Sequence, residues 1–226
     1  MVALQANEIC LFNQRLRLLD DKALYLPDVE ALLVSDVHLG KAETFQSLGI
    51  PVASQVNQEN LTRLRSLLVQ TQPKSLFILG DLFHSRRSLE PEVLSCWEMF
   101  LNEPCLKQPA VKVSLIVGNH DRGLVSALPP WAMTCQTEAM SLGSFLLSHE
   151  PQNSHGAALN ICGHIHPVVK LRSRTDSLRL PCFWVEPDQR RLTLPAFGGF
   201  TGGHEVALGG DRCAYVVCEG EVTAFR

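Results

Sequence analysis

The sequence lacks the apolar stretches that membrane segments require. Among its 226 residues there is no apolar run near the roughly 20 residues that a helix needs to cross a bilayer. Residues 1–10 also lack a basic segment followed by an apolar one, which is the pattern of a secretory signal. We therefore expect a globular protein that acts in the cytoplasm and has no membrane partner.

The chain also lacks an excess of charge of either sign. It carries 20 Lys and Arg against 23 Asp and Glu, a formal net charge of −3. Because the chain has no overall excess of basic residues, binding to DNA would need a local patch of positive charge. In the segment 170–191, six Lys and Arg stand against three Asp and Glu, leaving a local charge of +3. Such a patch is consistent with a phosphate-binding surface or with an ordinary solvated hairpin, and the sequence leaves both open.

Two other patterns are missing. The eight cysteines show no CxxC pair, and the chain is not a small secreted one, so we expect most of them to be reduced residues of the core. The glycine-rich stretch 198–203 lacks the lysine and the following helix of a nucleotide-binding phosphate loop. We expect this stretch to form a tight structural turn near the site.

Strand and helix patterns alternate in the first part of the chain, and short strands dominate the second. Continuous apolar runs predict buried strands, and leucines at helical spacing predict an amphipathic helix. No repeat or linker interrupts the order, which favours a single α/β domain over residues 1–226, built as a sandwich of two mixed sheets. The expected hairpin covers 7–27, the strands 31–34, 75–79, 113–117, 131–135, 144–147, 179–185, 191–194 and 213–218, and the helices 57–70 and 88–101.

Polar motifs follow several of these strands at the point where the apolar run ends. Strand ends are where α/β sheets place their ligands. The motifs offer carboxylate, amide and imidazole groups and no thiolate, a donor set suited to hard or borderline divalent cations. They comprise Ser35–His38, Gly80–His84, Gly118–Asp121, Ser148–Glu150 and Gly163–His166.

This donor set predicts a two-metal site for phosphoester hydrolysis. Two ions about 3.5–4 Å apart need a carboxylate to bridge them, and we assign that role to Asp81. The expected ligands of one ion are Asp36, His38 and His166, and those of the other are Asn119, His149 and His164.

Four further residues are candidates for catalysis and substrate binding. His120 follows Asn119 directly, so its side chain projects differently and is the candidate general acid for the leaving oxygen. His84 is expected either beside the phosphate or as the group that positions His120. Arg86 and Arg87 follow closely and are the expected substrate-binding residues.

Glycine stands directly before three of the expected ligands, at Gly80, Gly118 and Gly163. One such glycine would be an ordinary turn residue. Three glycines, each directly before a residue of a metal-binding type, indicate a backbone that turns sharply and lets a substrate approach closely.

At these motifs the sequence resembles the calcineurin-like metallophosphoesterase superfamily, whose pattern D-x-H, G-D, G-N-H-[DE], H and G-H-x-H runs here from Asp36 to His166. The resemblance implies a four-layer αββα sandwich and a dinuclear centre, commonly of manganese or of iron with zinc. One position departs from the phosphatase branches, which carry G-D-x-x-D-R. Here His84 stands in place of the second aspartate.

The form G-D-L-F-H is similar to the double-strand-break nucleases of the superfamily. Residues 180–184 and 194–203 resemble the bacterial ligase-associated DNA-damage-response endonuclease branch. The resemblance thus implies a Mn²⁺-dependent phosphodiesterase, a DNA endonuclease of bacterial repair that has a DNA ligase or helicase as a candidate partner.

Two alternatives remain at this point. The acidic net charge and the lack of a long DNA-binding appendage favour a small-molecule phosphatase or a cyclic-nucleotide phosphodiesterase. A non-enzymatic scaffold with a decayed site is disfavoured because every motif position retains its metal-type residue.

Overall fold

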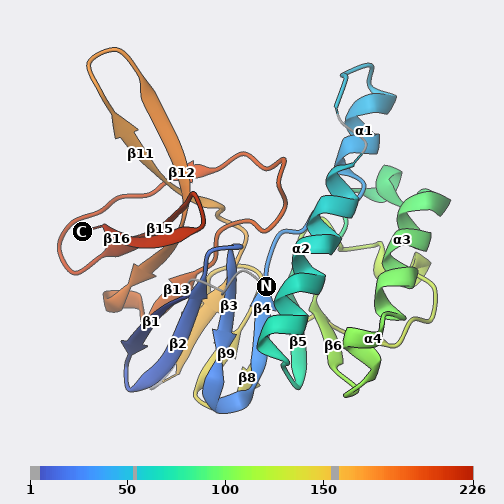
Figure 1. The fold of residues 1–226 in the computed structure, drawn as a ribbon, viewed down its shortest axis with the longest axis horizontal. Coiled ribbons are helices and arrows are strands. Elements are labelled where there is room, and N and C mark those ends of the chain that lie inside the picture. The colour runs from blue at the N-terminus through green and yellow to red at the C-terminus, as the bar shows by residue number, and fades with distance from the viewer. Residues whose placement is uncertain (1–5, 53–54, 154–157, 226) are drawn as a thin grey trace.

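The structure, a computed structural model, describes residues 6–52, 55–153 and 158–225. Two β-sheets lie face to face, and the α-helices cover the outer face of the first sheet (Figure 1). No helix in these ranges is both long and apolar enough to span a bilayer.

The first sheet is mixed, with its strands in sequence order. Its first four strands form an antiparallel meander, whereas the last four are parallel to one another. The expected hairpin over 7–27 is therefore three strands that continue into a fourth. The strands are β1 (Ala6–Leu11), β2 (Gln14–Leu19), β3 (Ala23–Leu26), β4 (Ala31–Val34), β5 (Ser75–Leu79), β6 (Lys112–Ile116) and β7 (Met133–Gln136).

The helices pack on this sheet through apolar residues at helical spacing. The helix α2 (Val56–Thr71) buries Leu61, Leu64, Leu67 and Leu68 in the core between helices and sheet. The helix α3 (Pro91–Leu101) begins three residues later than expected, at a proline whose fixed φ suits the first helical position. The remaining helices are α1 (Lys41–Ser47) and α4 (Pro104–Lys107), with the short 3₁₀ turns η1 (Pro27–Val29), η2 (Arg86–Ser88), η3 (Val125–Ala127) and η4 (Pro187–Gln189).

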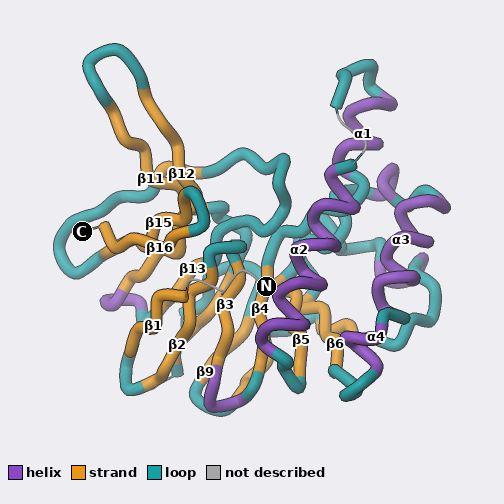
Figure 2. Tube along the Cα trace, viewed as in Figure 1, coloured by secondary structure: helices purple, strands orange, loops and turns teal. Residues whose placement is uncertain are grey.

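The second sheet is also mixed, and its strand order is β14-β11-β12-β13-β10-β9-β8, with β15 paired to β12 and β16 to β15. The β11–β12 hairpin projects beyond the sheet (Figure 1), and between β13 and β15 the chain is mostly loop (Figure 2). The strands are β8 (Met140–Leu142), β9 (Phe145–Leu147), β10 (Leu159–Cys162), β11 (Pro167–Arg172), β12 (Ser177–Glu186), β13 (Arg191–Thr193), β14 (His204–Glu205), β15 (Cys213–Cys218) and β16 (Glu221–Phe225).

Apolar side chains fill the space between the two sheets, among them Leu33 and Phe77 from the first and Phe183 from the second. Phe183 and its neighbour Trp184 are buried, so neither is available to stack on a base. The outer face of the second sheet carries no α-helix among the described residues. Val206 and Leu208 pack there instead, so a loop takes the place of the expected fourth helical layer.

The eight cysteines are all free, as expected for reduced core residues, although Cys10 is exposed. Cys162 and Cys182 are fully buried, and burial raises the pKa of each thiol to about 12. Both therefore stay protonated near neutral pH.

Candidate functional site

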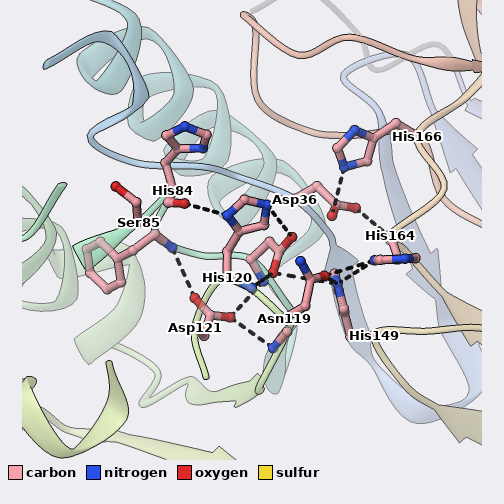
Figure 3. A network of polar contacts seen from close by, with 12 residues as sticks. Asp36, His84, Ser85, Asn119, His120, Asp121, His149, His164 and His166 are labelled. Atoms are coloured by element: carbon pink, nitrogen blue, oxygen red, sulfur yellow. Dashed lines mark hydrogen bonds and ion pairs between the residues drawn. The ribbon is translucent and has the colours of Figure 1, made fainter. Parts of the chain in front are cut away.

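The polar motifs converge where strands of the two sheets end. Because β4, β5 and β6 are parallel, the loops that follow them meet at one edge of the first sheet. The loop that follows β10 of the second sheet reaches the same place. Figure 3 shows the side chains from these loops turned toward a common centre. The structure thus brings together residues that stand far apart in the sequence.

One cluster comprises Asp36, His38 and His166, each of which places a ligand-type atom within 4.8 Å of the other two. Asp36 is fully buried, and its Oδ1 lies 3.0 Å from Nε2 of His166. Neither of those atoms has a partner in hydrogen-bond geometry, and Nδ1 of His38 is also unpartnered among the described residues. Burial lowers the pKa of His38 to about 2, so its imidazole is neutral, which is the form that binds metals.

His166 is held so that its inner nitrogen faces the cluster. Its Nδ1 lies 3.2 Å from the carbonyl of Gly202 and donates to it, which leaves Nε2 facing Asp36. A second hydrogen bond, from the backbone N–H of His204 to the carbonyl of His166, fixes the main chain. Orientation of a ligating imidazole through its other nitrogen is a common feature of metal sites.

A second cluster brings together Oδ1 of Asn119, Nε2 of His149 and Nδ1 of His164. The three separations are 2.8, 2.9 and 3.1 Å. The other nitrogen of His149 donates to the carbonyl of Leu79 at 2.9 Å, which leaves Nε2 facing Asn119 and His164. Neighbouring ligands on an octahedral ion with bonds of about 2.1 Å would be about 3 Å apart. The three atoms therefore have the spacing of one face of a coordination shell.

Asp81 lies between the two clusters. Its Oδ1 is 3.5 Å from Nε2 of His149, and ligand atoms of Asp36, Asp81 and His149 lie within 4.8 Å of one another. Burial raises the pKa of Asp81, and the nearby charge of Asp36 acts in the same direction. Two buried carboxylates at this separation repel each other, and cations placed between them would offset that repulsion.

The backbone at this centre is strained. Positive φ costs an L-residue roughly 1–2 kcal/mol, and such conformations gather at functional sites. Residues from both clusters and the aspartate between them share this conformation. Their φ angles are 54° at Asp36, 51° at His38, 54° at Asp81, 68° at His164 and 52° at His166.

The three motif glycines admit the side chains of the centre itself. A Cβ on Gly118 would overlap the carboxylate of Asp81, and one on Gly80 would overlap the ring of His149. A Cβ on Gly163 would lie 2.6 Å from Oδ2 of Asp36. The sequence predicted close approach by a substrate. In the structure, the groups that approach these glycines are the candidate metal ligands.

His120 lies beside Asp81 and is supported by His84. Its ring is 38% exposed, and Nε2 lies 3.9 Å from Oδ2 of Asp81. Its Nδ1 donates to the backbone carbonyl of His84 at 2.5 Å, and the two rings stack at 5.3 Å. Burial lowers the pKa of His84 to about 4, so this ring is neutral. Of the two expected roles of His84, the contacts favour positioning of His120.

The stacked rings continue to the protein surface. Phe45 of α1 stacks on His84 at a centroid distance of 6.2 Å, and Phe200 meets Phe45 edge-on at 5.7 Å. Phe200 is 46% exposed. His120, His84, Phe45 and Phe200 form a row that we call the aromatic row. No motif in the sequence predicts this row.

Asp121 is a further site residue to which the sequence analysis assigned no role. It is 1% exposed, and its Oδ2 accepts the backbone N–H groups of Asp81 at 2.7 Å and of Gly118 at 3.0 Å. Its Oδ1 accepts the N–H of Phe83 at 3.2 Å. The aspartate at the end of the G-N-H-D motif is the sequence feature that could have indicated this role, because a buried carboxylate needs hydrogen-bond partners.

The remaining candidates lie farther out. Arg86 and Arg87 are exposed on η2, which begins two residues after His84, and neither is within 4 Å of a carboxylate among the described residues. Their role in substrate binding stays a prediction. Of the two histidines that stand outside the motifs, His204 is exposed and His155 lies outside the described residues.

Comparisons with known proteins agree with this geometry. Residues 30–153 match the sequence profile of the family described as calcineurin-like phosphoesterase. The crystal structure of the Pseudomonas putida nuclease MPE is 37% identical to this chain, with a TM-score of 0.81 over 98% of this chain and 100% of that one.

More distant structures are similar over parts of the chain. The phosphoesterase YfcE of E. coli is 18% identical, with a TM-score of 0.40 over 82% of this chain and 87% of that one. The protein AQ665 of Aquifex aeolicus is 17% identical, with a TM-score of 0.39 over 60% and 78%. No curated protein sequence matches the chain.

Proposed function

The chain belongs to the calcineurin-like phosphoesterase family of metal-dependent hydrolases, and from this premise we propose that it is a dinuclear, manganese-dependent DNA endonuclease of bacterial repair. The observation that carries the proposal is the pair of clusters in which ligand-type oxygen and nitrogen atoms from distant parts of the chain lie 2.8 to 3.1 Å from one another. The similarity to a P. putida nuclease supports the choice of a nucleic acid phosphodiester.

In the proposal, each cluster would hold one divalent ion, and Asp81 would be the ligand shared between them. The oxygen and nitrogen donors suit Mn²⁺, with iron or zinc as alternatives. Cys162, next to Gly163 in sequence, is not a ligand because its buried thiol stays protonated and pairs with Oγ1 of Thr193. The first ion would take Asp36, His38 and His166, and the second Asn119, His149 and His164.

When bound, such ions polarise the phosphate and generate a hydroxide nucleophile near neutral pH. The side chains of the protein supply the rest. His120 is exposed enough to meet a substrate, and its Nε2 would donate a proton to the leaving oxygen. The carbonyl of His84 fixes the ring through Nδ1, so Nε2 is the nitrogen that faces the site. Asp81 lies close enough to stabilise the charged imidazole.

Several features of the surface near the centre suit a polyanion. Lys41, which begins α1, and the arginines Arg86 and Arg87 lack carboxylate partners within 4 Å in the described part of the chain. The exposed ring of Phe200 offers a surface on which a base can stack. The projecting β11–β12 hairpin carries the basic residues Lys170, Arg172, Arg174 and Arg179.

Several basic side chains of the segment 170–191, whose local charge is +3, are engaged in contacts within the protein. Arg191 pairs with the buried Glu186 at 2.6 Å, Arg172 lies 3.8 Å from Glu205, and the guanidinium of Arg190 lies over the ring of Phe12. Lys170 and Arg174 of the β11–β12 hairpin have no carboxylate within 4 Å among the described residues, and they remain available for a phosphate backbone.

The alternative is a small-molecule phosphatase or a cyclic-nucleotide phosphodiesterase, which the acidic net charge favours. Incubation of the purified protein and Mn²⁺ with circular single-stranded DNA separates the two. The proposal predicts nicks that disappear with EDTA. Robust turnover of bis(p-nitrophenyl) phosphate without nicking would establish the alternative. A repair role would in addition require a DNA ligase or helicase to bind the protein, which pull-down with the purified candidates tests.

A further inference from the structure

A cavity of 280 Å³ adjoins the candidate metal centre on the side of His166. Its walls come from the turn between β2 and β3, from β11 and β12, and from the loop 196–203. His166 contributes to both places, since its Nε2 faces Asp36 while its ring lines the cavity. The volume is near the lower end of small-ligand pockets, about 300 Å³, which gives room for a phosphate and part of a sugar.

The charged side chains that line this cavity are cationic. Lys22 reaches it from the first sheet and Arg179 from the second, and no carboxylate is among the lining residues. Neither cation is within 4 Å of a carboxylate in the described ranges, unlike Arg17, Arg65 and Arg191, each of which forms an ion pair. Two cations from separate sheets, each with no carboxylate within 4 Å in the described ranges, make the cavity suited to an anion.

Lys22 and Arg179 each contact a backbone carbonyl, and each keeps further N–H groups that can donate hydrogen bonds. Lys22 donates to the carbonyl of Gly198 over a long 3.4 Å, and Arg179 donates to the carbonyl of Gly203. An ammonium has three donors and a guanidinium five, so each retains N–H groups for another acceptor. A bound phosphate would use them.

We propose that this cavity binds a non-scissile phosphate of the polynucleotide strand, next to the phosphate that is cleaved at the metal centre. The inference rests on the proposed nuclease function and specifies how that function selects a polymer. A small diester reaches only the metal centre, whereas a strand also reaches Lys22 and Arg179. The two cations therefore contribute to the use of DNA and not to the chemical step.

The competing explanation is that both cations only clamp the glycine-rich loop that holds His166. The variants Lys22→Gln and Arg179→Gln separate the two explanations, because glutamine keeps a donor for the loop carbonyl and removes the charge. Lys112→Gln is the matched control, since Lys112 is exposed at the opposite edge of the sheet, at the start of β6.

The experiment measures kcat/KM with Mn²⁺ on a single-stranded oligonucleotide and on bis(p-nitrophenyl) phosphate, between about 50 and 200 mM salt. For the oligonucleotide, each variant is expected to reduce the slope of log(kcat/KM) against log salt by about 0.7, the value for one lost phosphate contact on a single strand. The ratio of oligonucleotide to small-diester activity falls, and the control keeps the wild-type slope.

Each other outcome overturns a distinct statement. An equal loss on both substrates with an unchanged salt slope would establish the clamp and refute the phosphate site. Wild-type slopes in both variants would also refute it. A wild-type protein that turns over the small diester but cleaves no oligonucleotide would refute the nuclease function itself, and the phosphate site with it. Thermal melting of each variant shows whether it is folded.

Discussion

The carboxylate of Asp121 accepts the backbone N–H of Asp81 at 2.7 Å, so the proposed bridging ligand is held through its main chain. The same oxygen accepts the N–H of Gly118. Asp121 thereby ties the loop after β5 to the loop after β6, which carries Asn119 and His120. This buried side chain therefore fixes the two loops to each other, together with the hydrogen bond from the backbone N–H of His120 to Oδ1 of Asp81 at 2.9 Å.

We expect Asp121→Asn to destabilise the protein by about 1–3 kcal/mol, because the amide cannot accept all three N–H groups and leaves a buried donor unsatisfied. Urea unfolding of the metal-free protein measures this loss, and Mn²⁺ affinity is expected to fall with it. Asp211→Asn, at an exposed aspartate, is the control. Equal stability of the two variants would show that Asp121 does not organise these loops.

Gly118→Ala is expected to abolish Mn²⁺ binding at the bridging position, because the added methyl would overlap the carboxylate of Asp81. The effect is steric and does not depend on an unusual backbone angle, since Gly118 is not among the glycines with positive φ. Calorimetric titration with Mn²⁺ checks it, and circular dichroism establishes that the variant is folded. Wild-type Mn²⁺ affinity in the folded variant would contradict the proposed contact.

The strands that carry the motifs were predictable because β4 and β5 are continuous apolar runs, which lie buried between helices and the second sheet. The helix α1 was not predicted, since only Ala42 of its seven residues is buried and no apolar periodicity marks it. The expected hairpin over residues 7–27 does not separate β3 from β2, because the turn between these two strands is only the short segment Asp20–Lys22.

The residues of the candidate centre could be found from the sequence because each follows a strand in a short motif of metal-type side chains. The contacts that support this centre could not be found from the sequence. The bond from Asp121 to Asp81 and the contact between Phe45 and Phe200 depend on how loops from distant parts of the chain pack. No local pattern encodes such distances.

The exposed end of the aromatic row predicts a contact with a nucleobase. Phe200→Leu removes the ring and keeps apolar volume, so we expect kcat/KM on single-stranded DNA to fall by about 5- to 150-fold, the equivalent of 1–3 kcal/mol of stacking. Substrates with a single abasic position check the assignment, because one of them should lose its sensitivity to the variant. Met99→Leu, at a residue 70% exposed on α3, is the control. Equal losses on every abasic substrate would argue against stacking.

Lys22 predicts a pH dependence of stability. Burial, and then the nearby charge of Arg63, lowers its pKa to about 8, while Asp21 opposes the shift; Arg179 and His166 line the same cavity. The folded pKa is below the unfolded value of 10.5, so the unfolded chain binds more protons between these values. The free energy of unfolding attributable to Lys22 therefore rises as the pH increases from about 8 to 10.5.

Urea unfolding of the wild type and of Lys22→Met across this range measures that contribution as the difference between the two proteins. The difference is expected to be constant below pH 8 and to shift in favour of the wild type above it. A difference that stays flat to pH 10 would show that Lys22 is not buried in its charged form.

The central claim is that two divalent ions bind between Asp36, Asp81 and the imidazoles of both sheets, and the stoichiometry of tightly bound Mn²⁺ tests it most directly. The account predicts two ions per chain in the wild type, one in His164→Ala, and two in the control His204→Ala, whose side chain is exposed. A wild-type protein that binds one ion or none, or a His164→Ala variant that still binds two, would contradict the account.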